Sequence, residues 1–95
     1  EGVDFAAEAG APVVAADDGE VALISNSLGG LGKIVLIRHA GGLTTVYAGI
    51  DPVEVQKGDP VRRGQVIGAV AASASPSLHF EVRRGAESVD PAGYL

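Results

Sequence analysis

Residues 54–68 read EVQKGDPVRRGQVIG. Apolar β-branched residues recur here at short intervals, and each run is interrupted by a glycine, which permits the tight corners at which a strand ends. Residues 57–59 and 63–65 therefore predict turns on either side of Val61, and residues 65–71 predict a strand. Short strands separated by glycine turns favour an all-β domain.

The rest of the chain continues this pattern. Further strands are predicted at 12–16, 20–24, 33–39, 43–48, 53–55 and 78–83. The run 33–39 is almost continuously apolar, so we expect it to be buried on both faces, and Gly41-Gly42 predicts a hairpin that returns the chain antiparallel. No segment repeats apolar residues at helical spacing over three turns. The fold class expected is all-β, an antiparallel β-sandwich.

Composition narrows the class of protein. The chain has 95 residues, so we expect residues 1–95 to form a single domain. It contains no cysteine, which excludes disulfides and thiol chemistry, and its net charge of −5 with no basic stripe argues against a nucleic-acid partner. No apolar run is long enough to cross a membrane. The first residue is Glu1 and no signal-like segment precedes it, so we expect a C-terminal fragment of a longer protein.

Residues 76–83, PSLHFEVR, provide the most specific motif. They resemble the H-x-H-F-E-[VI]-R strand of the LytM/lysostaphin-type zinc endopeptidases, which cut peptidoglycan cross-links, with Ser77 in place of the first His. Residues 54–68 likewise resemble the V-x-x-G-x-x-V-x-x-G-Q-x-I-G signature of barrel-sandwich hybrid domains. The resemblance implies an antiparallel β-sandwich of the LytM peptidase-like, barrel-sandwich hybrid type.

Further stretches match the LytM pattern in order along nearly the whole chain. Residues 2–7 resemble H-x-G-[VI]-D-[FI]-A, and residues 10–21 resemble G-T-P-V-x-A-x-x-D-G-x-V. Residues 32–39 resemble G-N-x-V-x-I-x-H, and residues 45–49 resemble T-x-Y-A-H. Residues 89–95 resemble V-N-P-x-x-Y-L. One such match is weak, but a set of them in the right order is specific.

The resemblance also implies what has become of the catalytic site. Two of the family's zinc-ligand positions are Asp4 and His79, and the third falls one residue before Glu1, so zinc is expected only if a third ligand lies upstream. The family's general-base histidines correspond to Gly49 and Ser77. Glycine cannot accept a proton, and a lone serine is a poor base, so we expect no catalytic residues and no enzyme activity.

Even without catalytic residues, we expect the groove that holds the family's active site to remain as a concave surface. Strand alternation is expected to place Thr45, Tyr47 and Gly49 on one face together with His79, Glu81 and Arg83. The partner-binding residues expected are Tyr47, Gly49, Ser77, His79, Glu81 and Arg83, with Leu28 and Leu31 as apolar contacts from loop 25–32. Arg83 is the expected anchor for a partner carboxylate or helix C-terminus.

This pattern resembles the degenerate LytM factors of Gram-negative bacteria, of the EnvC, NlpD and DipM type. The resemblance implies a periplasmic or cell-envelope protein that binds and activates a periplasmic zinc N-acetylmuramoyl-L-alanine amidase during cell division. In that group the groove is implicated in binding the amidase's inhibitory helix. Direct binding to peptidoglycan remains open from the sequence, as does the identity of the amidase.

Three other functions compete with this interpretation. A residual zinc-dependent peptidoglycan endopeptidase and a peptidoglycan-binding scaffold both fit the same family. A carrier or phosphotransfer domain of the same hybrid fold fits less well, because Tyr47 replaces the phospho-accepting histidine and neither Lys33 nor Lys57 lies in an acceptor hairpin. His39, at the end of an apolar strand, is expected to be structural.

Overall fold

A computed structural model of the chain describes residues 2–26, 32–85 and 87–89. Its strands are β1 (Val3–Ala6), β2 (Pro12–Val14), β3 (Gly19–Asn26), β4 (Lys33–Arg38), β5 (Leu43–Val53), β6 (Pro60–Val61), β7 (Val66–Val70), β8 (Ser77–Arg84) and β9 (Glu87–Val89). A short 3-10 turn, η2 (Ala40–Gly42), joins β4 to β5. Every strand pairing is antiparallel, which confirms the predicted fold class.

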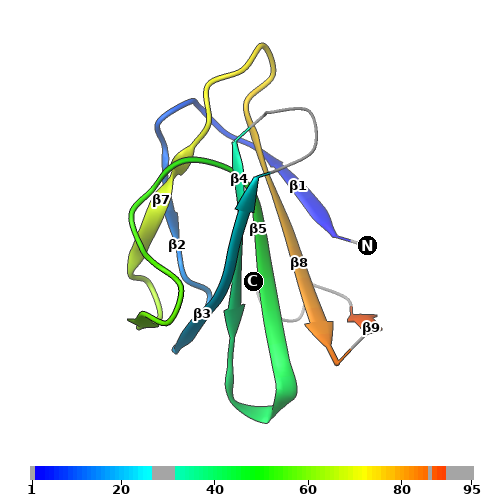
Figure 1. Cartoon of the computed structure of the whole chain (residues 1–95). Helices are drawn as coiled ribbons and strands as arrows, with labels where there is room; N and C mark the ends of the chain where they lie inside the picture. Colours follow the sequence, from blue (N-terminus) through cyan, green and yellow to red (C-terminus); the bar gives the residue numbers. More distant parts are fainter. Residues whose placement is uncertain (1, 27–31, 86, 90–95) are drawn as a thin grey trace.

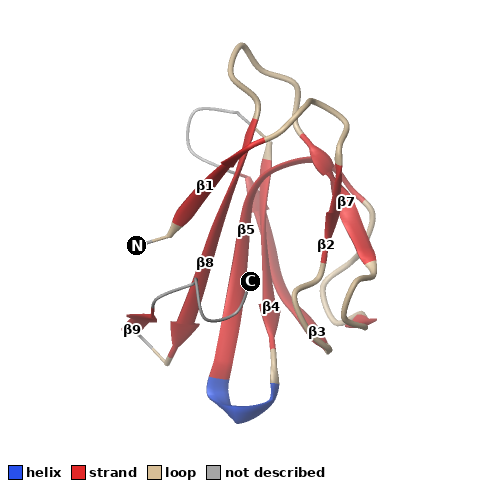
Figure 2. Cartoon of the chain, turned by 180° about the vertical axis from the view of Figure 1, so that it is seen from behind, coloured by secondary structure: helices blue, strands red, loops and turns tan. Residues whose placement is uncertain are grey.

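The strands form two layers that share β5. The larger layer has the order β1-β8-β5-β4-β3-β6, and β2 pairs with β7 in the smaller one. β5 belongs to both, since its first half pairs with β4 and β8 while Ile50 and Val53 pair with β7. The change of layer follows Gly49, whose φ of +94° is a backbone conformation that favours glycine. Figures 1 and 2 show β2 and β7 to one side of the larger sheet.

The core fills the space between the layers. Alternate residues of each strand point inward, and the fully buried set includes Val35 and Ile37 of β4, Ile67 of β7 and Val82 of β8. The expectation that 33–39 would be buried on both faces is wrong: the residues that alternate with Val35 and Ile37, among them Leu36, are only half-buried. A layer covers one face of β4, and among the described residues no second layer covers the other.

Other differences concern strand ends. The predicted separate strand at 53–55 is instead the end of β5, which runs without interruption to Val53. β1 and β9 were not predicted, because each is short and exists only by pairing with β8. The hairpin at Gly41-Gly42 is confirmed, with the N–H of His39 donating to the carbonyl oxygen of Leu43 at 2.8 Å. Leu28 and Leu31 lie outside the described residues.

Among the described residues, no helix has both the length and the apolar character needed to span a bilayer.

Candidate functional site: a charged column on the outer face of the large sheet

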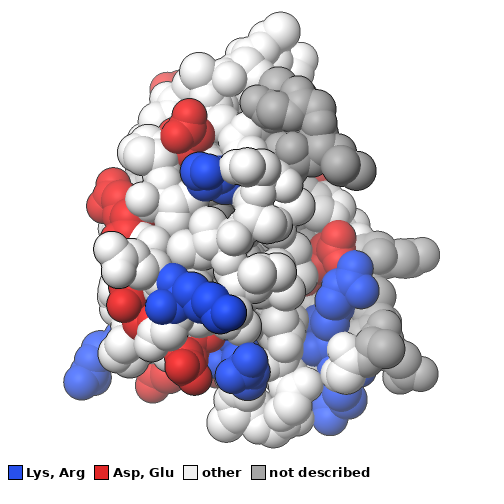
Figure 3. Space-filling view, viewed as in Figure 1, with Lys and Arg blue, Asp and Glu red and all other residues white. Residues whose placement is uncertain are grey.

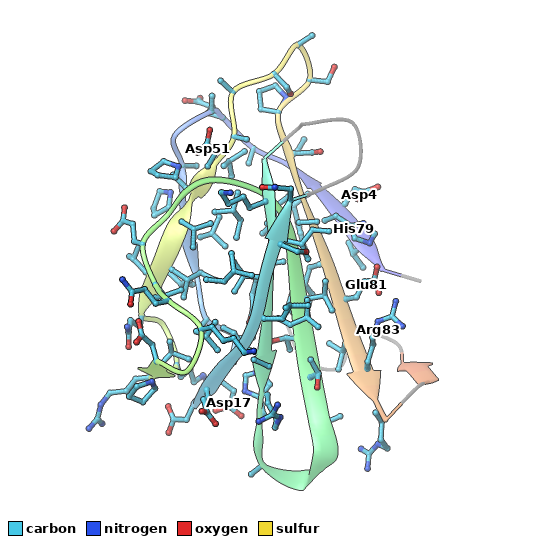
Figure 4. The ribbon with its side chains drawn as sticks, viewed as in Figure 1. Asp4, Asp17, Asp51, His79, Glu81 and Arg83 are labelled. Carbon is cyan, nitrogen blue, oxygen red and sulfur yellow. The ribbon has the colours of Figure 1, made fainter. Side chains whose placement is uncertain are left out.

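Four charged side chains form a continuous column along β8 and β1. The Nδ1 atom of His79 lies 2.6 Å from Asp4 Oδ1, and its Nε2 atom lies 2.7 Å from Glu81 Oε2. The second carboxylate oxygen of Glu81 accepts hydrogen bonds from Nε (3.0 Å) and Nη2 (2.6 Å) of Arg83. Figure 4 shows Asp4, His79, Glu81 and Arg83 in this order down the edge of the sheet. Asp4 reaches the column because β1 pairs with β8 so that Asp4 is opposite His79.

Both ring nitrogens of His79 face carboxylate oxygens, which can only accept hydrogen bonds, so the arrangement favours the doubly protonated imidazolium. The hydrogen bond to Asp4 is the main cause that raises the pKa of His79 above its ordinary 6.5; partial burial opposes it and Glu81 reinforces it. Burial alone would raise the pKa of Glu81, but the hydrogen bonds from His79 and Arg83 outweigh burial and hold it below its ordinary 4.5. Below the raised pKa of His79, the column therefore alternates negative and positive charges.

The column lies on the outer face of the large sheet, which is the face that points away from β2 and β7. Strand register places Ala48 beside His79, Val46 beside Glu81 and Thr44 beside Arg83. The same rows continue onto β4 with Ile34, Leu36 and Arg38, and onto β3 with Leu23 beside Leu36. Leu23, Leu36 and Val46 thus form an apolar panel that borders the charged column. Figure 3 shows an uncharged band on this side of the molecule, with charged groups toward both margins.

Tyr47 and Thr45 are not part of this face, contrary to the sequence-based expectation. Tyr47 is opposite Phe80 and Thr45 is opposite Val82, so both point into the core. Tyr47 is only 2% exposed, and its ring meets that of Phe80 edge to face with 5.5 Å between centroids. The error came from the pairing: side chains opposite each other share a face, and the register pairs His79 with Ala48 rather than with Tyr47 or Gly49.

The phenol of Tyr47 belongs instead to a buried polar relay. It accepts a hydrogen bond from the N–H of Ala16 at 2.9 Å and lies 2.7 Å from the hydroxyl of Thr45. That hydroxyl is 2.7 Å from Nε2 of His39, whose Nδ1 lies 2.7 Å from the carbonyl oxygen of Asp18. Burial is the main cause that raises the pKa of Tyr47. The relay ties the turn after β2 to the large sheet, so His39 has the structural role predicted for it.

The two positions expected to have lost catalytic bases are adjacent in space. Gly49 and Ser77 meet where β5 bends beside the start of β8, and a Cβ built on Gly49 would lie 2.8 Å from the carbonyl oxygen of Ser77. The φ of Gly49, +94°, would in addition strain any other residue at this position. The backbone as it stands therefore does not accommodate a side chain at position 49.

Comparison with known proteins identifies the family. The sequence model described as "Peptidase family M23" matches residues 1–91. The chain belongs to peptidase family M23.

Three of its relatives carry names that describe either a peptidase or a protein of cell division and murein hydrolase activation. The chain is 42% identical over 93 residues to DD-carboxypeptidase/endopeptidase Mpg of Neisseria meningitidis, covering 95% of this chain and 21% of the relative. It is 36% identical over 101 residues to the cell division protein DipM of Caulobacter vibrioides (97% and 17%). It is 34% identical over 97 residues to the murein hydrolase activator NlpD of Escherichia coli (100% and 26%). The chain thus spans about a quarter or less of the length of these relatives.

Solved structures confirm the M23 fold. The lysostaphin structure superposes with a TM-score of 0.86 at 29% identity, covering 96% of this chain and 40% of lysostaphin. Helicobacter pylori Csd3 gives the same TM-score at 38% identity, covering 99% of this chain and 26% of Csd3. The predicted barrel-sandwich hybrid of the LytM type is confirmed.

The M23 resemblance implies zinc, so we tested whether the described residues fit it. A catalytic zinc takes three protein ligands and keeps one position open. Among the residues described, no group of three or more His, Cys, Asp or Glu side chains is placed to hold a metal. Asp4 and His79 hydrogen-bond each other directly instead of converging on a shared point. The described side chains therefore do not make a three-ligand zinc centre.

The structure unites some predicted site residues and separates others. His79, Glu81, Arg83 and Asp4 form one network, Gly49 and Ser77 lie beside its upper end, and Tyr47 is removed to the core. The apolar panel of Leu23, Leu36 and Val46 was missed. Its signal was the continuous apolar run within 33–38, but only the β4–β5 register, which pairs Leu36 with Val46, shows which of these residues lie on the outer face.

Proposed function

We propose that this domain is a non-catalytic activator of a peptidoglycan amidase, an N-acetylmuramoyl-L-alanine amidase of the periplasm, during cell division. The observation that carries the proposal is the geometry at Gly49 and Ser77: neither position supplies a base, and position 49 has no room for one. Hydrolysis needs a group that takes the proton from water. The relatives named murein hydrolase activator and cell division protein support the same role in the cell envelope.

The outer face offers a chemically matched surface for such a partner. The apolar panel suits the apolar side of an amphipathic helix, and the neighbouring column offers charges of both signs. Arg83 is about two-fifths exposed, so it can bind a partner carboxylate while it keeps its bond to Glu81. Binding here would activate the amidase by favouring its active conformation. Neither zinc nor catalysis by the domain is required.

The decisive experiment is dye release from labelled peptidoglycan by the domain, by the amidase and by the two together. We expect release only from the mixture, above the amidase alone. Arg83→Glu should reduce the stimulation about tenfold or more, as expected for a central charged contact. Arg84→Glu is the matched control, because Arg84 is opposite Leu43 and points to the other side of β8. Equal stimulation by both variants would contradict the proposed surface.

A residual zinc-dependent endopeptidase is the second candidate. Glu81 holds one nitrogen of His79, as an outer carboxylate does for a zinc-bound histidine, but the other nitrogen is hydrogen-bonded to Asp4. The relative Mpg is named as a peptidase. This candidate predicts about one zinc per chain by elemental analysis and dye release by the domain alone, abolished in His79→Ala. Metal-free protein that binds peptidoglycan but neither cuts it nor stimulates an amidase would indicate a scaffold instead.

A further inference from the structure

A second surface lies on the opposite side of β8 from the charged column. An apolar pocket of about 420 Å³ opens between β1 and β2. Its walls include Phe5 of β1, Val14 of β2, and Leu78 and Phe80 of β8, with Arg63 at its margin. The residues of β8 that line it alternate with His79 and Glu81, so the pocket shares no side chain with the outer face. Its volume is within the range of ordinary ligand pockets.

One wall of the pocket is an open sheet edge. β1 ends the strand order of the large sheet, and within the described part of the chain it pairs with β8 alone. The N–H of Ala7 donates to the carbonyl oxygen of Pro76, so Val3 and Phe5 direct their backbone groups toward β8 while Asp4 and Ala6 direct theirs outward. Figure 2 shows β1 and β2 nearest the viewer, with β5 and β8 behind them.

The pocket also presents apolar surface and a cation. Phe5 is 36% exposed and Val14 is 44% exposed, and both belong to the small set of large apolar residues that the fold leaves uncovered. The backbone N–H of Arg63 donates to Asp18 Oδ1 at 2.8 Å. Its side-chain guanidinium forms no ion pair with any carboxylate of the described residues. An apolar pocket beside an unpaired guanidinium is complementary to an apolar segment that carries a carboxylate.

We propose that this pocket binds an extended segment of a partner protein by strand addition to β1. The segment hydrogen-bonds the outward backbone groups of Asp4 and Ala6 and places two apolar side chains, two positions apart, against Phe5 and Leu78. A carboxylate on the same segment pairs with Arg63. The pocket lies on the other face of β8 from the amidase surface, and the two sites meet only at Asp4, whose side chain belongs to the charged column. The domain could therefore hold two partners at once.

The test uses a synthetic capped hexapeptide with two leucines two positions apart followed by a glutamate, added to ¹⁵N-labelled protein. We expect amide shifts at Asp4, Phe5, Ala6 and Val14, with Glu81 and Arg83 of the outer face unaffected. Arg63→Glu should weaken binding about fivefold or more, since an exposed ion pair is replaced by a repulsive one. Arg62→Glu is the matched control: Arg62 is the neighbouring exposed arginine and does not line the pocket.

A second pair of variants tests the apolar wall. Phe5→Ala should weaken peptide binding, whereas Val66→Ala should not, because Val66 is 43% exposed but lies outside the pocket. Each variant is first checked for an unchanged dispersed amide spectrum, so loss of fold is not mistaken for loss of binding. The proposal is overturned by shifts confined to the outer face or by none at millimolar peptide. It is equally overturned by concentration-dependent dimerisation through β1, or by peptide binding that tightens tenfold on removal of residues 90–95.

Discussion

At the scale of single residues, Tyr47 carries more of the stability of this domain than of its recognition. Its ring fills the core against Phe80, and its phenol oxygen accepts the N–H of Ala16. Tyr47→Phe should lower the free energy of unfolding by about 1–3 kcal/mol, because the buried hydroxyl of Thr45 and the part-buried N–H of Ala16 lose their acceptor. Tyr47→Ala should cost about 3–5 kcal/mol through the cavity it leaves. Urea denaturation measures both.

The control for Tyr47 is Val14→Ala, at an exposed apolar position, where a change within about 0.5 kcal/mol is expected. A Tyr47→Ala variant as stable as wild type would show that the side chain is not a core element. Because Tyr47 is buried, Tyr47→Ala is not suited to test partner binding with the fold intact.

Also at the residue scale, His79 predicts a pH dependence of stability. Its folded pKa is raised, so its contribution is complete below the unfolded value of about 6.5 and is lost as pH rises through the folded pKa. Glu81 has a lowered folded pKa, so its contribution is complete above about 4.5 and is lost as pH falls. The column should therefore stabilise the fold most between these values.

The measurement compares wild type with His79→Gln by urea denaturation from about pH 5.5 to about pH 9. The difference in stability should be largest at the acidic end of this range and should shrink as pH rises. Arg84→Gln, outside the column, should show a difference that does not change with pH. A constant difference for His79→Gln would mean that the imidazolium does not stabilise the fold.

At the scale of elements, the bend of β5 depends on Gly49. Gly58 has nearly the same φ, +92° against +94°, but a Cβ there would meet nothing within 4 Å. Gly58→Ala should cost about 1–2 kcal/mol from backbone strain alone. Gly49→Ala should cost a further 1–3 kcal/mol or so, because its Cβ would also press on the Ser77 carbonyl.

This pair of alanine variants also bears on the proposal that the domain is non-catalytic. If Gly49→Ala is the more costly, then a histidine at position 49 requires the bend itself to move. Equal costs at positions 49 and 58 would mean that the backbone yields easily, and the double variant Gly49→His with Ser77→His would then be the next measurement.

At the scale of the whole molecule, the two layers should unfold together. β5 pairs with β4 and β8 in one layer and with β7 in the other, and the buried core is continuous across both. We expect a single transition with one midpoint when far-UV circular dichroism is compared with NMR methyl signals of Ile67 and Val82. Separate midpoints for these two residues would show that β2–β7 unfolds independently.

Much of the fold and part of the site could be predicted from the sequence. Glycine turns and β-branched runs determined the antiparallel strands, and the motif around His79 and Glu81 marked one strand as the site, since these signals are local. The predicted site was wrong where it depends on how β5 and β8 pair. Alternation divides each strand into two faces, but it does not say which face of β5 joins which face of β8.

The sequence by itself determined the fold class and the family pattern, and it predicts that no base stands at Gly49 or Ser77, because these follow from residue identity along the chain. Only the tertiary structure decided that Tyr47 is a core residue, that Asp4 and Glu81 hold both nitrogens of His79, and that position 49 has no room for a side chain. The physical reason is that register, and contact between strands more than seventy residues apart, arise only when the whole sheet packs.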